Sequence, residues 1–286
     1  MSVQILTDST SYIKKAERDE LNINVVSLSV SFQDESFREE DIDNNTFYSK
    51  MAKKGIPLSS QPSLEELYNS MCKVVETGDD LLCVFISSDM SGTFSAAHTV
   101  KDMVLEKYKD AKIEIVDSRS NCMQLGFAAI VAARAAAMGK DLMEVKKTAE
   151  DNIRRSRFLF IPDTLEYLKK GGRIGGAGAL IGNLLKIIPI LTVENGKTSV
   201  LTKVRTKPKA VITMIERMLK DIAEFGLGEV MVHHINCYNE AKALAGVIMN
   251  KLNIQVGICD IGPVIGVHVG PGAIGIVYYT NKNMRS

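Results

Sequence analysis

A lone histidine in a glycine-rich segment is the side chain of this sequence with the clearest reason to contact a ligand. Residues 262–275 contain five glycines, and His268 is the one polar side chain among them. Glycine lets the backbone approach a ligand closely or adopt positive φ angles, and Gly270 is a candidate ligand-binding residue. We therefore expect a loop from which the His268 imidazole touches a bound molecule, although the sequence alone leaves a structural role open.

Two serine-containing segments upstream supply hydroxyl groups for the same purpose. Ser59 and Ser60 lie in a Ser/Pro-rich turn before a helical pattern. Ser91, Gly92 and Thr93 follow a buried strand pattern and open a helix, where free N–H groups and the positive dipole end attract anions. Each segment also has a simpler interpretation, an N-cap at Ser91 or an ordinary turn at Ser59. We predict that both converge with the glycine-rich segment on the head group of an anionic ligand.

Other catalytic and cofactor motifs are excluded by their context. Residues 270–275 match a dinucleotide fingerprint, but that motif must open a helix, and here only eleven residues follow, with the pattern of a strand. The glycine cluster at 171–178 lacks the Gly-Lys-Ser/Thr ending of a phosphate-binding loop and fits a helix break. No Gly-x-Ser-x-Gly elbow or metal-ligand spacing of histidines occurs, so we predict no catalytic residue and no metal site. His98, His233 and His234 are expected to make local hydrogen bonds or lie at the surface.

Composition places the chain among ordinary globular proteins with room for two domains. It has 286 residues, 45% hydrophobic and 24% charged, with a net charge of +1, which argues against a basic nucleic-acid binder. The five cysteines form no Cys-x-x-Cys pair, and neither a secretory leader nor a spanning segment of about 18 apolar residues is recognisable. We therefore predict a cytoplasmic protein with reduced thiols.

The first half alternates between strand and helix patterns. Apolar runs at 3–6, 25–30, 81–86 and 113–116 fit parallel strands buried on both faces. Helices are expected from a capping box at Ser63–Glu66, after Ser91, across 121–138 and from Asp141. This alternation predicts a three-layer α/β/α domain with a parallel sheet over residues 1–156.

The second half has a different pattern. A strand at 158–161 is followed by a hairpin, 188–193 and 198–204, turned at Asn195-Gly196. Helices at 209–225 and 238–252 then alternate with strands at 229–234, 255–259 and 273–280. This pattern predicts a two-layer α+β domain with a mixed sheet over residues 157–286, packed directly against the first domain with the ligand between them.

Positive charge is concentrated in one part of the chain. Residues 151–209 hold twelve Lys and Arg against four Asp and Glu. Lys203, Arg205, Lys207 and Lys209 alternate and would share one face of an extended segment. With Arg173 in the glycine cluster, they are either a solvated surface or a docking patch for a phosphate or an acidic partner.

Six motifs in register make the whole chain resemble the DegV family. The second motif departs slightly, because Ser59 stands where the family usually has threonine, and the hydroxyl is kept. The motifs are Thr7-Asp8-Ser9-Thr10-Ser11, Ser59-Ser60-Gln61-Pro62-Ser63, Ser91-Gly92-Thr93-Phe94-Ser95-Ala96, Leu168-Lys169-Lys170-Gly171-Gly172-Arg173-Ile174, Lys203-Val204-Arg205-Thr206 and 266–272.

The resemblance implies a bacterial cytoplasmic carrier and not an enzyme. It implies one long-chain fatty acid held between the two domains, with its carboxylate bound by Ser59, Ser91 and His268. It further implies that a separate fatty acid kinase phosphorylates this ligand, that Arg173 and Arg205 engage the kinase, and that membrane contact is only transient. No cofactor other than the fatty acid is expected.

Physical estimates agree with a lipid ligand but leave alternatives open. Each buried CH₂ contributes about 0.8 kcal/mol, so a sixteen-carbon chain offers on the order of 10 kcal/mol before costs. The apolar helix at 121–138 is a candidate wall for that chain, or a plain core helix. One alternative is an enzyme, or the substrate subunit of a kinase, that binds a small polyol or carbonyl compound through His268. Another is a protein-binding module with an empty space between its domains.

Overall fold

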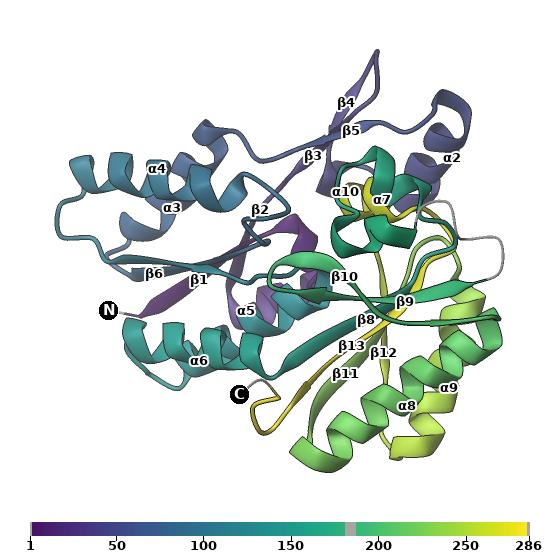
Figure 1. The fold of residues 1–286 in the computed structure, drawn as a ribbon. Helices are drawn as coiled ribbons and strands as arrows, with labels where there is room; N and C mark the ends of the chain where they lie inside the picture. The colour runs from purple at the N-terminus through teal and green to yellow at the C-terminus, as the bar shows by residue number, and fades with distance from the viewer. Residues whose placement is uncertain (1, 181–186, 285–286) are drawn as a thin grey trace.

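The computed structural model describes residues 2–180 and 187–284 and contains two main sheets with helices around them (Figure 1). The first sheet is parallel, with strand order β2-β1-β6-β7. Helices α3 and α4 cover one face, and α5 and α6 cover the other. The predicted three-layer α/β/α arrangement is therefore confirmed. Its elements are β1 (Val3–Asp8), β2 (Ile23–Val26), β6 (Asp80–Phe85), β7 (Ile113–Asp117), α3 (Leu64–Val75), α4 (Thr93–Lys107), α5 (Cys122–Ala137) and α6 (Leu142–Arg154).

Local sequence signals account for the helix starts in this region. The Ser63 hydroxyl accepts the backbone N–H of Glu66, and the Glu66 carboxylate accepts the backbone N–H of Ser63. These two bonds form a complete capping box. Asp141 and Glu144 make the same exchange at the start of α6. Helix α5 is buried along nearly its whole length, because it lies between the two sheets and contacts strands of both.

A small third sheet, β4-β3-β5, was not expected from the sequence. The single strand predicted at 25–30 is wrong, since the chain leaves the parallel sheet after β2 and enters the small sheet at β3. At the crossing, the Leu28 N–H donates to the Ser9 hydroxyl and the Leu28 carbonyl accepts the Glu39 N–H, which replaces ladder bonding. The elements here are β3 (Ser29–Ser31), β4 (Ser36–Arg38), β5 (Leu58–Ser60), α1 (Lys15–Leu21), α2 (Asn44–Lys54) and the 3₁₀ turns η1 (Ser9–Ser11) and η2 (Glu39–Asp41).

The second main sheet is mixed, with strand order β10-β9-β8-β13-β11-β12. Only β11 and β12 pair in parallel among the described strands of this sheet. Helices α8 and α9 pack on one face and α5 contacts the other, which confirms the predicted mixed-sheet architecture. The elements are β8 (Ser156–Ile161), β9 (Ile188–Glu194), β10 (Lys197–Val204), β11 (Leu227–His234), β12 (Gly257–Asp260), β13 (Ile274–Thr280), α7 (Glu166–Lys170), η3 (Gly175–Leu180), α8 (Lys207–Phe225), α9 (Tyr238–Leu252) and α10 (Pro263–Val269).

The prediction that Lys203, Arg205, Lys207 and Lys209 share one face of an extended segment is wrong for the last two residues. Strand β10 ends at Val204, and the Thr206 side chain caps α8 by accepting the Lys209 N–H. Lys207 and Lys209 therefore lie on the first turn of a helix, where alternate residues do not share a face. Lys207 is also paired with Glu240, at 2.7 Å.

The two sheets are joined by a continuous apolar core. The ring of Phe127 on α5 meets that of Tyr279 on β13 edge-on, with centroids 5.2 Å apart. Only Arg155 separates α6 from β8, so the chain passes between the sheets without a flexible linker. The division at residue 156 stays a prediction. Within the described residues, no helix has the length and apolar character needed to cross a membrane.

Candidate functional site

A cavity of about 310 Å³ lies between the main sheets. Its wall comes from both halves of the chain and from the small sheet. The polar lining consists of Ser59, Ser60, Gln61, Ser91, Asn121, Arg173, Thr198 and His268, with Gly92. The apolar lining consists of Leu28, Ile86, Met90, Phe158, Phe160, Leu168, Val193, Val264, Ile265 and Val269.

Ser59 and His268 are in direct contact at this cavity. The Ser59 hydroxyl lies 2.7 Å from His268 Nε2, although the two residues are 209 positions apart. Neither residue lies in the loop or turn expected, because Ser59 is on strand β5 and His268 is on the last turn of α10. Pro263 suits the first turn of that helix and Gly270, with φ of +84°, ends it. A helix can therefore form despite the glycines.

The His268 imidazole is neutral at ordinary pH. Burial lowers its pKa to about 4, and the neighbouring Arg173 charge acts in the same direction. Its Nδ1 has no hydrogen-bond partner among the described residues. A side chain at Gly171 would overlap this nitrogen, so the glycine makes room for the ring. A neutral imidazole can donate one N–H to an anion, with the tautomer set by the ligand and Ser59.

Ser91 lies immediately before the N-terminus of α4. The N-cap residue is Gly92, so the simple N-cap interpretation of Ser91 is wrong. The Ser91 hydroxyl instead accepts the Thr93 N–H at 3.3 Å and lies 2.9 Å from the Thr93 hydroxyl. A side chain at Gly92 would overlap the Gln61 amide. The first turn of a 15-residue helix thus adjoins the cavity beside two polar side chains, a setting that favours negative charge.

Arg173 extends the polar wall between Ser91 and His268. Its Nε donates to the Met90 carbonyl at 3.1 Å and its Nη1 to the Gly171 carbonyl at 2.7 Å. Among the described residues it is the one cation that lines the cavity. The sequence predicts that Arg173 docks a partner, and the structure places its positive charge on the cavity wall.

The predicted site residues divide into two groups. Ser59, Ser60, Ser91, Gly92, Arg173 and His268 all line the cavity, whereas Thr93, Gly270 and Arg205 do not. Thr93 acts through its contact with Ser91, and a side chain at Gly270 would overlap the Tyr167 ring. Arg205 is exposed beyond the end of β10.

Sequence reasoning missed three polar lining residues and most of the apolar wall. Gln61 is adjacent to the Ser59-Ser60 pair and could have been included on that ground. Asn121 and Thr198 had no motif to single them out. Of the predicted helical wall, only Asn121 and Cys122 border the cavity or the void beside it, because the rest of the helix is packed against the strands of the two sheets.

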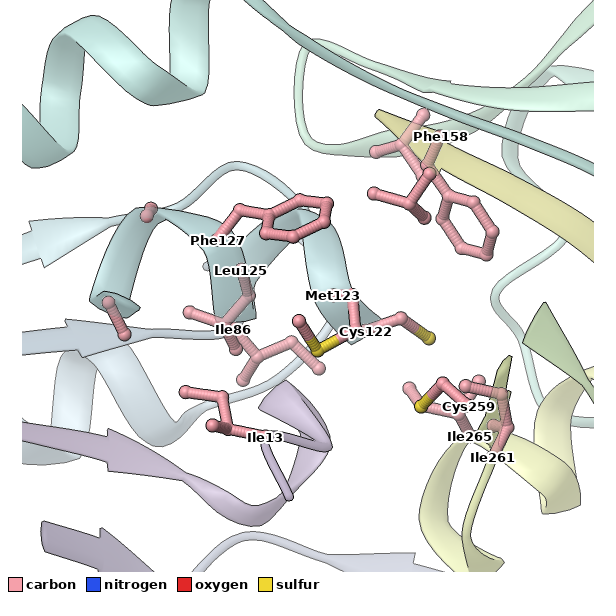
Figure 2. Close-up of a cluster of buried hydrophobic side chains, with 14 of the residues drawn as sticks. Ile13, Ile86, Cys122, Met123, Leu125, Phe127, Phe158, Cys259, Ile261 and Ile265 are labelled. Atoms are coloured by element: carbon pink, nitrogen blue, oxygen red, sulfur yellow. The ribbon is translucent and has the colours of Figure 1, made fainter. Parts of the chain in front are cut away.

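A smaller apolar void adjoins the cavity. Phe158, Phe160, Ile265 and Val269 line both spaces. Figure 2 shows Cys122, at the start of α5, pointing toward Cys259, Ile261 and Ile265, with Phe158 across the gap. The lining of both spaces thus continues as apolar side chains away from the hydroxyl and imidazole groups.

His233 borders this void, and the prediction that it makes local hydrogen bonds or lies at the surface is wrong. It is 2% exposed, and neither ring nitrogen has a hydrogen-bond partner among the described residues. The ring meets Phe158 edge-on, with centroids 5.2 Å apart. Burial lowers the pKa of His233 to about 3, so the ring stays neutral. In the described part of the chain, no group of three His, Cys, Asp or Glu side chains is arranged to hold a metal ion.

Fold and cavity together define a class of protein: a two-sheet α/β protein with a largely apolar cavity between a parallel and a mixed sheet. A family model described as "Uncharacterised protein, DegV family" matches residues 2–281. A DegV domain-containing protein of Clostridium acetobutylicum is 70% identical over 285 residues, which cover 100% of both chains. The chain belongs to the DegV family, as its six motifs predict.

Solved structures of the family have the same fold. DegV of Bacillus subtilis, described as a fatty acid binding protein, superposes with a TM-score of 0.87 at 32% identity, covering 98% of this chain and 99% of its own. A stearic acid-binding protein of Eubacterium ventriosum gives a TM-score of 0.88 at 26% identity, covering 97% and 98%. The architecture described above is therefore the DegV fold.

Proposed function

We propose that this protein binds one long-chain fatty acid in the cavity between its sheets. The observation that carries the proposal is the contact between Ser59 and a neutral His268 on the wall of a largely apolar cavity. Few polar groups set into apolar walls are typical of sites for amphipathic ligands. The descriptions of two structural neighbours as fatty acid and stearic acid binding proteins support the same ligand.

The ligand carboxylate is placed at Ser59, Ser91 and His268, with Ser60, Gly92 and Arg173 beside it. Burying a carboxylate without donors costs several kcal/mol, and hydroxyl and N–H donors offset that cost. The hydrocarbon chain then lies along the apolar wall and extends toward Phe158 and the adjoining void. At about 0.8 kcal/mol per buried CH₂, the chain supplies most of the binding free energy.

The protein acts as a carrier, and a separate kinase phosphorylates the carboxylate. This part of the proposal rests on the family motifs. Arg205 is exposed and can contact a partner directly. Arg173 lies on the cavity wall, where a docked enzyme would meet it next to the ligand carboxylate. A small polyol or carbonyl substrate fits less well, because such a ligand needs many polar contacts and the walls are mostly apolar.

Lipid extraction with mass spectrometry tests the ligand directly. The purified protein, incubated with a mixture of free fatty acids and desalted, is expected to release one equivalent of a long-chain fatty acid. Ser91→Ala is expected to release less, or to fail as a substrate for a fatty acid kinase, while Ser70→Ala, on α3 and outside the cavity lining, retains the ligand. Absence of any acyl chain from the wild type after incubation would overturn the proposal.

A further inference from the structure

A buried carboxylate outside the cavity lining is linked, directly or through one further residue, to three residues of the wall. Glu39 is 6% exposed and lies on η2, after the small sheet. Its Oε1 accepts the backbone N–H of Val264 at 2.9 Å and the Tyr12 hydroxyl at 2.8 Å. Its Oε2 accepts the Ser9 hydroxyl at 2.5 Å. None of these contacts is required by a helix cap or a sheet ladder of its own element.

Each of these contacts leads to a residue that lines the cavity. Val264 is bonded directly. Tyr12 accepts the Ile265 N–H at 3.3 Å, and Ser9 accepts the Leu28 N–H at 3.0 Å. Val264 and Ile265 lie on the first turn of α10, the helix that carries His268. One carboxylate therefore holds both the start of α10 and the segment of Leu28 in place.

On these contacts we propose that Glu39 is a positioning residue, whose ionised carboxylate sets the cavity wall and the His268 helix for ligand retention. This proposal rests on the proposed fatty acid site. The bonding pattern favours the ionised form, because both carboxylate oxygens accept hydrogen bonds and the Ser9 hydroxyl, which accepts the Leu28 N–H, donates its own proton to Oε2. A proton on Glu39 Oε2 would compete for that position and leave one hydroxyl hydrogen without an acceptor.

Protonation of the Glu39 carboxylate is expected near neutral pH. Burial raises its pKa to about 7, against the three hydrogen bonds, which lower it. Tyr12 stays protonated, since burial and Glu39 raise its pKa well above the usual value. Groups on every packed element are acidic or neutral in character. They are Asp8 at the end of β1, Tyr12 after η1, Tyr48 on α2, Cys122 on α5, and His268 at the far end of α10.

The test measures how fast stearate leaves the protein as a function of pH. Wild type and Glu39→Gln are loaded with radiolabelled stearate, and transfer to excess phosphatidylcholine vesicles is followed between pH 6 and 8.5. The wild type is expected to release stearate about tenfold faster at pH 6 than at pH 8.5. Glu39→Gln is expected to release it fast at every pH, because an amide cannot accept from all three donors. Any pH effect from the ionisation of stearate itself is common to both proteins and cancels.

Two further variants separate positioning from a general loss of folding. Glu40→Gln changes the adjacent exposed residue, which pairs with Arg18, and should match the wild type. Ser9→Ala and Tyr12→Phe each remove one link to the wall while keeping Glu39, and each should speed release severalfold. If Glu39→Gln keeps the wild-type rate and pH profile while stearate is bound, the inference fails and the proposed function stands. If the wild type binds no stearate, the proposed function itself fails.

Discussion

Two joints connect the halves of this protein across the cavity, and they are built differently. At the first, α10 is held by buried groups of the first half, including the Tyr48 hydroxyl, which donates to the Ile261 carbonyl at 3.1 Å. At the second, the turn of the β9–β10 hairpin is held by one buried hydrogen bond, from the Ser87 hydroxyl to the Gly196 carbonyl at 2.8 Å, and otherwise by exposed charges around Arg119, which bonds Asp89 at 2.5 Å and the Asn195 carbonyl. Both joints carry residues of the cavity wall, Val264 and Ile265 at the first and Val193 and Thr198 at the second.

This difference indicates that the cavity is rigid on the α10 side and can open on the hairpin side. Exposed ion pairs contribute at most about 1 kcal/mol and weaken with salt, whereas buried, fully bonded groups are expensive to disrupt. We therefore expect the α10 joint to persist while the hairpin joint breaks and re-forms. If a fatty acid binds in the cavity as proposed, we expect it to enter on the hairpin side.

The largest expected effect comes from overpacking the α10 joint with Gly266→Ala. A side chain at this position would overlap the Tyr48 hydroxyl, so the added methyl should lower the unfolding free energy by about 3 kcal/mol despite the better helix propensity of alanine. Denaturant unfolding measures the loss. In a Tyr48→Phe background the same substitution should cost clearly less, and equal costs in the two backgrounds would show that Tyr48 does not limit the packing there.

A second prediction concerns His233, a buried polar side chain that, unlike those of the α10 joint, has no hydrogen-bond partner among the described residues. His233 has a folded-state pKa of about 3, below its ordinary value near 6.5. The unfolded chain therefore binds the extra proton, and stability is lost as pH falls below about 6.5. Relative to His233→Leu, the wild type should lose about 2 kcal/mol of unfolding free energy between pH 7 and pH 5. The other titrating groups are common to both proteins, so parallel pH profiles would contradict a neutral buried His233.

Breaking the hairpin joint should have a smaller effect on stability. Arg119→Ala removes the contacts to Asp89, Asp117 and the Asn195 carbonyl, and we expect a loss of at most about 1 kcal/mol at low salt that disappears near 1 M NaCl. Stearate should nevertheless leave the variant severalfold faster. Arg154→Ala, an exposed arginine paired with Asp151 far along the chain from this joint, is the matched control. A loss above 3 kcal/mol would mean that the two joints are equivalent.

The same contrast explains what could be predicted from the sequence. Periodicity located α9 at its observed bounds, and the Asn-Gly pair located the turn at Asn195-Gly196, because those signals are local. The small sheet was missed, since its strands are three residues long and the bond from Leu28 to Ser9 is not visible in any pattern. Glycine density suggested a loop around His268, but the glycines of α10 serve close packing against Tyr48 and other neighbours.

That Ser59, Ser91 and His268 lie close together could be predicted, whereas the groups that hold them in place could not, and the binding role of the three residues stays a prediction. Motif register brought Ser59, Ser91 and His268 to one cavity, and the structure places all three on its wall. Glu39 could not be found in this way, because a glutamate in the acidic stretch 34–43 reads as a solvated residue. Burial of an acidic side chain depends on tertiary contacts that no local spacing records.

The smallest expected effect is that of a Ser59→Thr substitution, at the contact between the small sheet and α10. Ser59→Thr restores the residue usual in the family and keeps the hydroxyl that meets His268 Nε2. Strand positions tolerate β-branched residues, so stearate affinity should stay within about twofold of the wild type. Ser59→Ala removes the hydroxyl and leaves the imidazole without this partner, and it should weaken binding by about tenfold, the equivalent of one hydrogen bond of about 1.4 kcal/mol. Titration of both variants with stearate measures the difference, and equal affinities for Thr and Ala would remove Ser59 from the carboxylate site.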